Sequence, residues 1–428
     1  AGGGGGAGSG PGAGGRPGGG GRAGAGSGGS AGGAGSGGAG QGGARPCDGD
    51  AACRGEVGAG SICVGGTCTR GEGCDASTLV VVDPAFAGPI EASLAGACAY
   101  RGLAAADAAI APAVTRAVVV YAAALRLDAP FRVRRGVALE GRGPGGAPVA
   151  LDFAAPSVEA LLTLEAGSSA AGFALEGHDT ARGVVAAEGV GSLRGPLTIA
   201  HARVALEPAA GATLEAKGTQ AAPVRLSAND VGARVPAGAS LTLEGDGAAG
   251  GFVLEGTRAG AGVLVLAGDA SAPVRLAGLL ARDNGGNSAE GTGAIELRPG
   301  RVVAVADGVF EGNVRALNFN GEGASLFDSF VGVTIERNAF TNRAGVSVLL
   351  CGTDLGASPR LTLGPGNTFD GTPVLTQAAC LGVENVQRSS CELGGTLGYT
   401  ANGEPFDLQC DALPLPASGA PPAPGEPP

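Results

Sequence analysis

The chain has 428 residues, 85 of them Gly, and a formal net charge of −11 from 39 acidic and 28 basic residues. A nucleic-acid-binding protein needs a basic surface, so this balance argues against that class. No run of 18 apolar residues occurs, and the sequence therefore predicts no membrane-spanning helix.

The first 45 residues are almost entirely Gly, Ala and Ser. They carry too little apolar side chain to offset the entropy of ordering, so residues 1–45 are predicted to be a flexible tether. The sequence contains no Met, even at position 1, which predicts a signal peptide that has been removed. The tether is similar to the spacer of a bacterial lipoprotein. We expect a secreted protein, or one held at the outer cell surface with a possible lipid tether.

A Cys-rich segment, residues 46–78, follows the tether. With few large apolar residues, it is expected to depend on cross-links, and we favour disulfides over zinc because no C-x2-C pair is present. Six Cys allow 15 pairings, so the connectivity stays open. These six are Cys47, Cys53, Cys63, Cys68, Cys74 and Cys98.

An N-terminal cap is predicted over residues 79–116. A strand at 79–82 is followed by a short Ala-rich helix within 100–111, which Pro112 would end. Strand character resumes at 117–121. A helix in this place would cover the open edge of the first strands of a longer β-structure.

Repeated phrases then indicate a stacked architecture. The phrases LTLE at 162–165 and GFALEG at 172–177 return, with their spacing kept, as LTLE at 241–244 and GFVLEG at 251–256. The phrase APVRL at 222–226 returns at 272–276, and APVAL at 147–151 precedes both. We interpret these offsets as two or three steps of roughly 25 residues each, the period of a stacked repeat.

Residues 131–391 contain only short apolar alternations separated by Gly, Asn, Asp and Pro, with no helical period. A sandwich or propeller would also give many short strands. The repeat offsets and the lack of Asn-Gly and Asp-Gly hairpin turns favour a parallel coil of about ten to twelve turns.

Aromatic and amide residues recur toward the end of this region. The spacing predicts an internal stack of Phe310, Phe340 and Phe369. Asn338 and Asn367 are predicted to form an amide ladder at a bend, although both would also suit an ordinary turn.

Four more Cys lie near the C-terminal end of the coil, which is predicted to extend over residues 79–410. Their three possible pairings would staple residues 351–410 over the last open edge. Residues 411–428 are Pro-rich and predicted to be an unpacked tail. The four are Cys351, Cys380, Cys391 and Cys410.

Residues 79–391 resemble the right-handed parallel β-helix, or pectin-lyase-like, proteins of bacterial surfaces. The resemblance depends on VVVDP at 80–84, FRVRRGVALEG at 131–141 and the phrase at 334–342 that contains N-x-F-x-N. It implies an all-β solenoid with a short capping helix. The same coil serves lyases, hydrolases, adhesins and spacers, so it does not imply one activity.

Hydrolases of this group carry N-x-D, D-D, G-H-G and R-x-K phrases. Only Gly177-His178-Asp179 approaches one of them, and Lys217 lacks its Arg. We expect His178 and Asp179 to be solvated turn residues. The second histidine, His201, does not complete a Ser-His-Asp pattern, because no G-x-S-x-G phrase is present.

A lyase would need a basic residue and often calcium. One cluster of acidic residues with two nearby arginines could converge on a single face of the coil, although solvated charges are the usual case. It consists of Asp307, Glu311, Asp328, Glu336, Arg315 and Arg337. We assign no catalytic, cofactor-binding or metal residue, with calcium as the one cofactor considered.

The sequence thus favours a non-enzymatic cell-surface or secreted protein with a structural, adhesion or recognition role. A partner would be a polysaccharide or another surface component. The alternative is a diverged polysaccharide lyase or glycoside hydrolase that acts on acidic polysaccharides.

Overall fold

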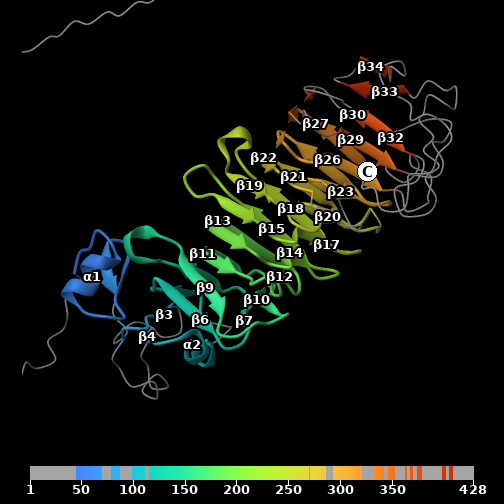
Figure 1. Ribbon diagram of the computed structural model, residues 1–428. Coiled ribbons are helices and arrows are strands. Elements are labelled where there is room, and N and C mark those ends of the chain that lie inside the picture. Colours follow the sequence, from blue (N-terminus) through green and yellow to red (C-terminus); the bar gives the residue numbers. More distant parts are fainter. Residues whose placement is uncertain are drawn as a thin grey trace, which may run out of the picture. The chain divides into compact units, whose positions relative to one another are not determined.

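A computed structural model describes the chain over residues 45–69, 79–86, 99–110, 115–268, 270–285, 293–320 and 332–341, and further strands beyond. Within these residues three parallel sheets wrap around one core, and one strand from each sheet makes one rung (Figure 1). The third sheet has ten strands in one continuous ladder, so the coil completes ten rungs. The predicted parallel β-helix is confirmed.

The first and second sheets share the long strands β11 (Ser169–Glu176) and β13 (Val190–Ala200), which bend from one sheet into the other. The first sheet also contains β3 (Leu79–Val82), β5 (Ala117–Val120), β8 (Ala138–Gly141), β15 (Thr213–Lys217), β18 (Ser240–Glu244), β21 (Val274–Ala277), β24 (Val303–Ala306), β27 (Val333–Glu336) and β30 (Thr362–Leu363). The second sheet also contains β6 (Ala124–Leu127), β9 (Val149–Phe153), β16 (Val224–Ser227), β19 (Phe252–Glu255), β22 (Leu279–Arg282), β25 (Val309–Glu311), β28 (Ala339–Thr341) and β31 (Thr368–Phe369).

The third sheet consists of β7 (Phe131–Val133), β10 (Ala160–Leu164), β12 (Arg182–Ala186), β14 (Val204–Pro208), β17 (Val231–Val235), β20 (Val263–Val265), β23 (Ile295–Leu297), β26 (Arg315–Asn320), β29 (Val346–Cys351) and β32 (Val374–Gln377). Two short strands, β33 (Gly398–Ala401) and β34 (Glu404–Asp407), form an antiparallel pair beside β30.

We call the bends from the first to the second sheet the first corner, and those from the second to the third sheet the second corner.

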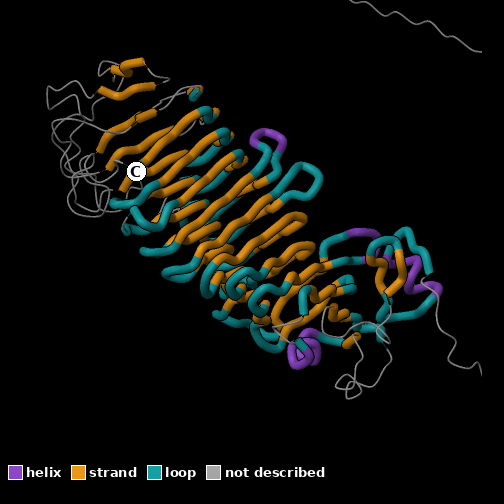
Figure 2. The backbone as a smooth tube through the Cα atoms, turned by 180° about the vertical axis from the view of Figure 1, so that it is seen from behind, coloured by secondary structure: helices purple, strands orange, loops and turns teal. Residues whose placement is uncertain are grey.

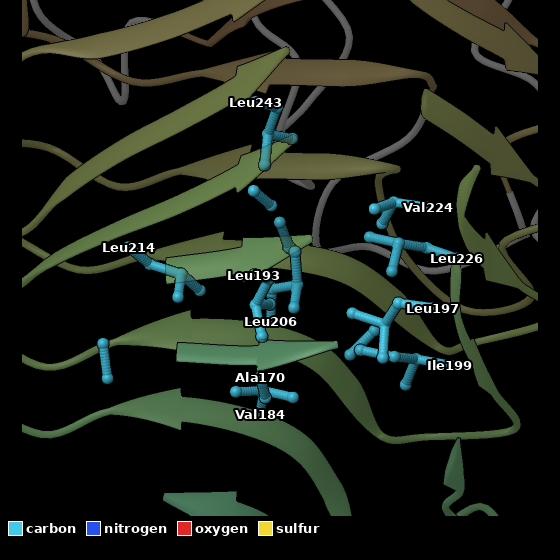
Figure 3. Close-up of a cluster of buried hydrophobic side chains, with 14 of the residues drawn as sticks. Ala170, Val184, Leu193, Leu197, Ile199, Leu206, Leu214, Val224, Leu226 and Leu243 are labelled. Atoms are coloured by element: carbon cyan, nitrogen blue, oxygen red, sulfur yellow. The ribbon is translucent and has the colours of Figure 1, made fainter. Parts of the chain in front are cut away.

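Alternation of side chains along each strand makes the core. Every second residue of a strand points inward, and in a parallel coil the inward residues of successive rungs stack. Leu193 pairs with Ala170 below it and Ala216 above it, and Leu197 pairs with Val224. Figure 3 shows such residues from all three sheets meeting in the interior.

The N-terminal cap is confirmed. Helix α2 (Leu103–Ala109) lies within the predicted span, and its Leu103 and Ala106 join the core cluster beside Val80 and Val118 of the first strands. Figure 2 shows the short helices at this end of the coil and in one loop, where the 3-10 turn η3 (Gly247–Ala249) lies.

The Cys-rich segment folds as α1 (Asp50–Glu56) and the hairpin β1 (Ile62–Val64) and β2 (Thr67–Thr69). The bridges Cys47–Cys63 and Cys53–Cys68 confirm disulfides over zinc for these four Cys. Ile62 is buried against Val81 and Val119, which point outward from the first sheet. Cys74, Cys98 and the side chains of the four C-terminal Cys lie outside the described residues.

Two of the four repeated phrase pairs stack as the sequence predicted, and two do not. Phe173 pairs with Leu197, Leu197 with Val224 and Val224 with Phe252, so the GFALEG echo spans three rungs of the second sheet. Val149 pairs with Phe173 one rung lower, so the phrases at 147–151 and 222–226 also lie three rungs apart.

The other two echoes do not stack. LTLE at 162–165 belongs to the third sheet at β10, whereas its copy at 241–244 forms β18 of the first sheet. Likewise, the two APVRL phrases form β16 and β21, in the second and first sheets. All three sheets require the same inward and outward alternation, so one short phrase suits any of them.

The amide ladder of Asn338 and Asn367 is confirmed at the first corner. The Asn338 amide N–H groups donate to the Asn367 side-chain oxygen at 3.2 Å and to the Val305 carbonyl at 3.0 Å. Above it, Asn367 donates to the Ile335 carbonyl at 2.9 Å. Buried backbone groups at the bend thereby obtain partners that a straight strand would have supplied.

The second corner has a ladder that the sequence reading missed. Asn284 donates to the Asn313 side-chain oxygen at 2.9 Å and to the Leu254 carbonyl at 3.0 Å. Two rungs below, Asn229 donates to the Ile199 carbonyl and accepts from the Ala202 N–H. The predicted aromatic stack is confirmed for Phe310 and Phe340, whose ring centres are 5.0 Å apart. Phe369 pairs with Phe340 along the strands.

Candidate functional site

A cluster of histidines and carboxylates lies at the second corner, on the outer side of the second sheet. It belongs to the rungs of β9, β11 and β13, which we call the lower part of this corner. Asp152 is the next-to-last residue of β9, and Glu176 is the last residue of β11, one rung above. Leu151 and Leu175 pair with each other and are buried, so the residue that follows each of them points outward. Adjacent strands are about 4.8 Å apart, and the backbone positions of Asp152 and Glu176 are therefore equivalent and about that far from each other.

Each carboxylate has a histidine partner. Glu176 accepts from His201, whose Nδ1 lies 3.0 and 3.1 Å from the two carboxylate oxygens. The His178 backbone N–H also donates to Glu176, at 3.3 Å. Asp152 Oδ2 lies 3.7 Å from His178 Nε2. Both histidines of the chain thus meet the same pair of carboxylates, an arrangement able to move protons at an exposed surface.

Asp179 is tied to the rungs above. Its Oδ1 accepts from Arg258 Nη2 at 2.5 Å, and the same nitrogen donates to Asp230 at 3.0 Å. The hydrogen bond from Arg258 holds the pKa of Asp179 below its ordinary value. Asp179 is therefore a carboxylate that stays ionised, and it fixes the position of the turn that carries His178.

The backbone of this turn is unusual in one respect. A residue with positive φ recurs at the second corner, including His201 at 48°, Ala228 at 50° and Asp283 at 53°, so this conformation belongs to the corner. His178 and Asp179 have φ of 49° and 63°, two such residues in succession. Non-Gly residues in this region cost of order 1–2 kcal/mol each, and such strain concentrates at functional sites.

Of the described members of the acidic cluster considered for calcium or elimination chemistry, only Asp307, Glu336 and Arg337 come together. Arg337 donates to both carboxylate oxygens of Asp307, at 2.7 and 3.0 Å, and also contacts Glu336, all at the first corner. Glu311 ends β25 at the second corner. Arg315 belongs to the third sheet, where burial lowers its pKa. Asp328 lies outside the described residues.

The remaining sequence candidates are resolved as follows. Lys217 makes a 3.2 Å ion pair with Glu244 on the outer side of the first sheet, away from the histidines. In the part of the chain that the structure describes, the one group with the spacing of metal ligands is Cys47, Cys53 and Cys68, and these sulfurs form the disulfides. None of the described helices is long and apolar enough to span a membrane.

The sequence reading treated His178 and Asp179 as turn residues and did not select Asp152 or Glu176. The signal that could have found them is the alignment of LDF at 151–153 with LEG at 175–177, one turn of the coil further along. That alignment has the same offset as the pairing of Val149 with Phe173. It places the two carboxylates on adjacent rungs beside the only phrase that approaches a hydrolase motif.

Comparisons with known proteins give no family and three distant structural matches. No family model matches the chain, and no curated protein matches it. Two matching solved structures are catalytic domains of GH87 alpha-1,3-glucanases, one in complex with tetrasaccharides and one from Streptomyces thermodiastaticus strain HF3-3. Their sequence identities are 11% and 14%, with TM-scores of 0.29 and 0.26 over 72% and 63% of this chain. A third is ORF18 of Geobacillus virus E2, at 8% identity, a TM-score of 0.23 and 61% coverage of this chain.

The chain spans 66%, 64% and 53% of the lengths of these three structures. The sequence-based preference for a non-enzymatic protein is corrected, because two of the matches are catalytic domains of glycoside hydrolases. With TM-scores below 0.5, these matches assign no reaction to this chain. Its activity has to be argued from its own residues.

Proposed function

We propose that the chain is a secreted glycoside hydrolase that cleaves a polysaccharide lying across the outer side of the second sheet. The observation that carries the proposal is the pair Asp152 and Glu176, held on adjacent rungs with a histidine beside each. Retaining glycosidases use two carboxyl groups roughly 5–5.5 Å apart, close to the 4.8 Å spacing of strands. The two disulfides support an oxidising, extracellular location.

The mechanism follows from the surroundings of each carboxylate. Asp152 attacks the anomeric carbon while the glycosidic C–O bond breaks and Glu176 gives its proton to the departing oxygen. Glu176 then takes a proton from water, and the water oxygen displaces Asp152 from the sugar. His201, at 3.0 Å from Glu176, provides a second proton carrier at that carboxylate.

The outer side of the second sheet is suited to an extended substrate. Between the two corners, the outward residues on three successive rungs are Ala150, Ala174 and Thr198, which pair with one another along the strands. All three are at least partly exposed. A chain of sugars can lie on this surface, and the large side chain beside the carboxylates is the exposed Arg126, whose Nε lies 3.7 Å from Asp152 Oδ1.

The experiment is a screen of the full chain for new reducing ends on α-1,3-glucan, β-1,3-glucan, β-1,4-glucan and polygalacturonate. Asp152→Asn and Glu176→Gln should each lower turnover of the cleaved polymer roughly 10³-fold, within the range for acid–base and nucleophile losses. Glu215→Gln is the matched control, since Glu215 is an exposed carboxylate of β15 on the first sheet. Turnover that survives both site substitutions, or unsaturated products that indicate elimination, would contradict the proposal.

A further inference from the structure

A cleft of about 550 Å³ lies between the disulfide-bonded segment and the first corner of the coil. One wall is the start of α1, with Asp50 and Ala51, and the other consists of loops and bends of the lowest rungs. Tyr121, Glu140 and Arg142 contribute the remaining large side chains of the lining. The cleft is separate from the carboxylate pair, which lies at the second corner.

The charged groups of the cleft are already paired. Arg142 donates to Glu140 at 2.9 Å through Nη2, and through Nη1 it contacts Asp50 and the Cys63 carbonyl at 3.4 and 3.3 Å. Its lining thus holds two carboxylates and one guanidinium, and the guanidinium is engaged by both carboxylates. Such a site repels an anionic ligand, whereas the carboxylate oxygens left over accept hydrogen bonds from hydroxyl groups.

Backbone rather than side chain forms much of the wall. A Cβ added at Gly145 or Gly146 would meet no atom within 4 Å, so both face open space. Gly141 and Gly172 are closely opposed, since a Cβ on either would lie about 2 Å from the other's carbonyl oxygen. The N–H groups of Gly143, Gly146 and Ala147 are bonded within this loop, so Gly145 and Gly146 mainly provide room for a ligand. Tyr121 is held in place by the Arg54 guanidinium, 4.3 Å from its ring centre.

The second sheet connects this cleft to the candidate catalytic pair. Ala147 lines the cleft and Asp152 lies five residues further along the same segment, which is roughly 16 Å of extended chain. Gly172 also lines the cleft, and Glu176 lies four residues further along β11, which is roughly 13 Å of extended chain. The exposed Ala150 lies between the two sites on the outward side.

We propose that this cleft is a binding subsite for uncharged sugar units of the same polysaccharide that the carboxylate pair cleaves. The inference rests on the proposed function and narrows its substrate to a neutral glycan, in place of the acidic polysaccharide that the sequence suggested. Sugar hydroxyls donate to Asp50 and Glu140, and the glycine-rich wall provides room for the ligand.

The test is calorimetric binding to the full chain carrying Glu176→Gln, with glucose pentasaccharides linked α-1,3, β-1,3 or β-1,4 and with a pentasaccharide of galacturonic acid. At least one neutral probe should bind, and the uronic acid probe should bind at least tenfold more weakly. Adding Ala147→Trp, which fills the cleft, or Glu140→Ala should weaken binding of the neutral probe at least tenfold. Ala249→Trp, at an exposed alanine of η3, is the matched control and should leave binding unchanged.

The proposal is overturned if no neutral probe binds, if the uronic acid probe binds as tightly, or if Ala147→Trp has no effect. The outcomes separate the two hypotheses. Turnover that persists in Ala147→Trp with unchanged binding refutes the subsite and leaves the hydrolase intact. If Ala147→Trp weakens binding but the wild-type chain cleaves none of the polymers, the hydrolase is refuted and the subsite remains.

Discussion

The lower and upper parts of the second corner are the same bend, but only the upper part has polar side chains on its inward side. In the upper part, Asn229, Asn284 and Asn313 point inward and bond the buried backbone of neighbouring rungs. In the lower part, Ala202 occupies that inward position, and the polar side chains at the bend, including Glu176, point outward.

The difference shows how one fold separates stability from activity. Inward residues are constrained by the rung above and below, so they repeat along the chain. Outward residues are free of that constraint, so Glu255 repeats Glu176 three rungs higher but has Arg282 as its partner. The two histidines, which have no counterpart there, are what distinguish the lower part as a functional candidate.

The largest effect on stability is expected from the upper part of the coil at Phe340. It is fully buried and stacked on Phe310, so Phe340→Ala should lower the free energy of unfolding by about 3–5 kcal/mol. Chemical denaturation measures this loss. A loss below 1 kcal/mol would mean that the stack does not support the coil.

A smaller loss is expected at the ladder itself. Asn284→Ala leaves the Leu254 carbonyl and the Thr257 N–H without their side-chain partner, which should cost about 2–3 kcal/mol. Ala substitution of Glu311, an exposed residue on the next rung, provides the comparison and should change stability by less than about 0.5 kcal/mol. Equal effects at the two positions would remove the contrast between inward and outward residues.

The lower part should behave in the opposite way. Glu176→Gln should change the free energy of unfolding by less than about 1 kcal/mol, because the side chain is partly exposed and its ion pair lies at the surface. The same variant should lose turnover. A strongly destabilised Glu176→Gln protein would make Glu176 a structural residue and leave the lower corner without a functional argument.

The smallest effect concerns two exposed ion pairs, one at each corner. Arg337 holds the pKa of Asp307 below its ordinary value, and Arg258 does the same for Asp179. A carboxyl group with a lowered folded-state pKa stabilises the fold above its unfolded-state pKa of about 4, and this contribution is lost as the pH falls further.

Arg337→Gln and Arg258→Gln should therefore lower the melting temperature only slightly at pH 7, and the difference from wild type should shrink toward pH 3. Arg275→Gln, at an exposed position of β21, is the control and should show no such pH dependence. A difference from wild type that grows as the pH falls would reverse the assigned sign.

Much of the fold was accessible from the sequence because stacking imposes repetition. The cap helix, the Phe310 and Phe340 stack and the Asn338 ladder all follow from spacing along the chain. Repeated phrases did not predict stacked strands where one phrase suits several sheets, as with LTLE in β10 and β18. Alternation determines which side chains point inward, but it does not determine which sheet the strand joins. The Asn229 and Asn284 ladder was missed for another reason, because the register of the strands places Thr257, and not a third Asn, on the rung between them.

The candidate site was less accessible. Asp152, Glu176 and His201 are each a full turn of the coil apart in the sequence and form no local motif, so only the register of the strands brings them together. The cleft was not predictable either, since its walls come from the disulfide-bonded segment and from rungs much further along the chain, as the contact of Arg142 with Asp50 illustrates.

The most direct test of the central claim is the stereochemistry of hydrolysis, followed by proton NMR of the first sugar product released by the wild-type chain. The backbone spacing of one rung is close to the carboxyl separation of retaining glycosidases, so we predict retention of the anomeric configuration. Inversion would require carboxyl groups roughly 6.5–9.5 Å apart, and it would show that Asp152 and Glu176 are not the catalytic pair.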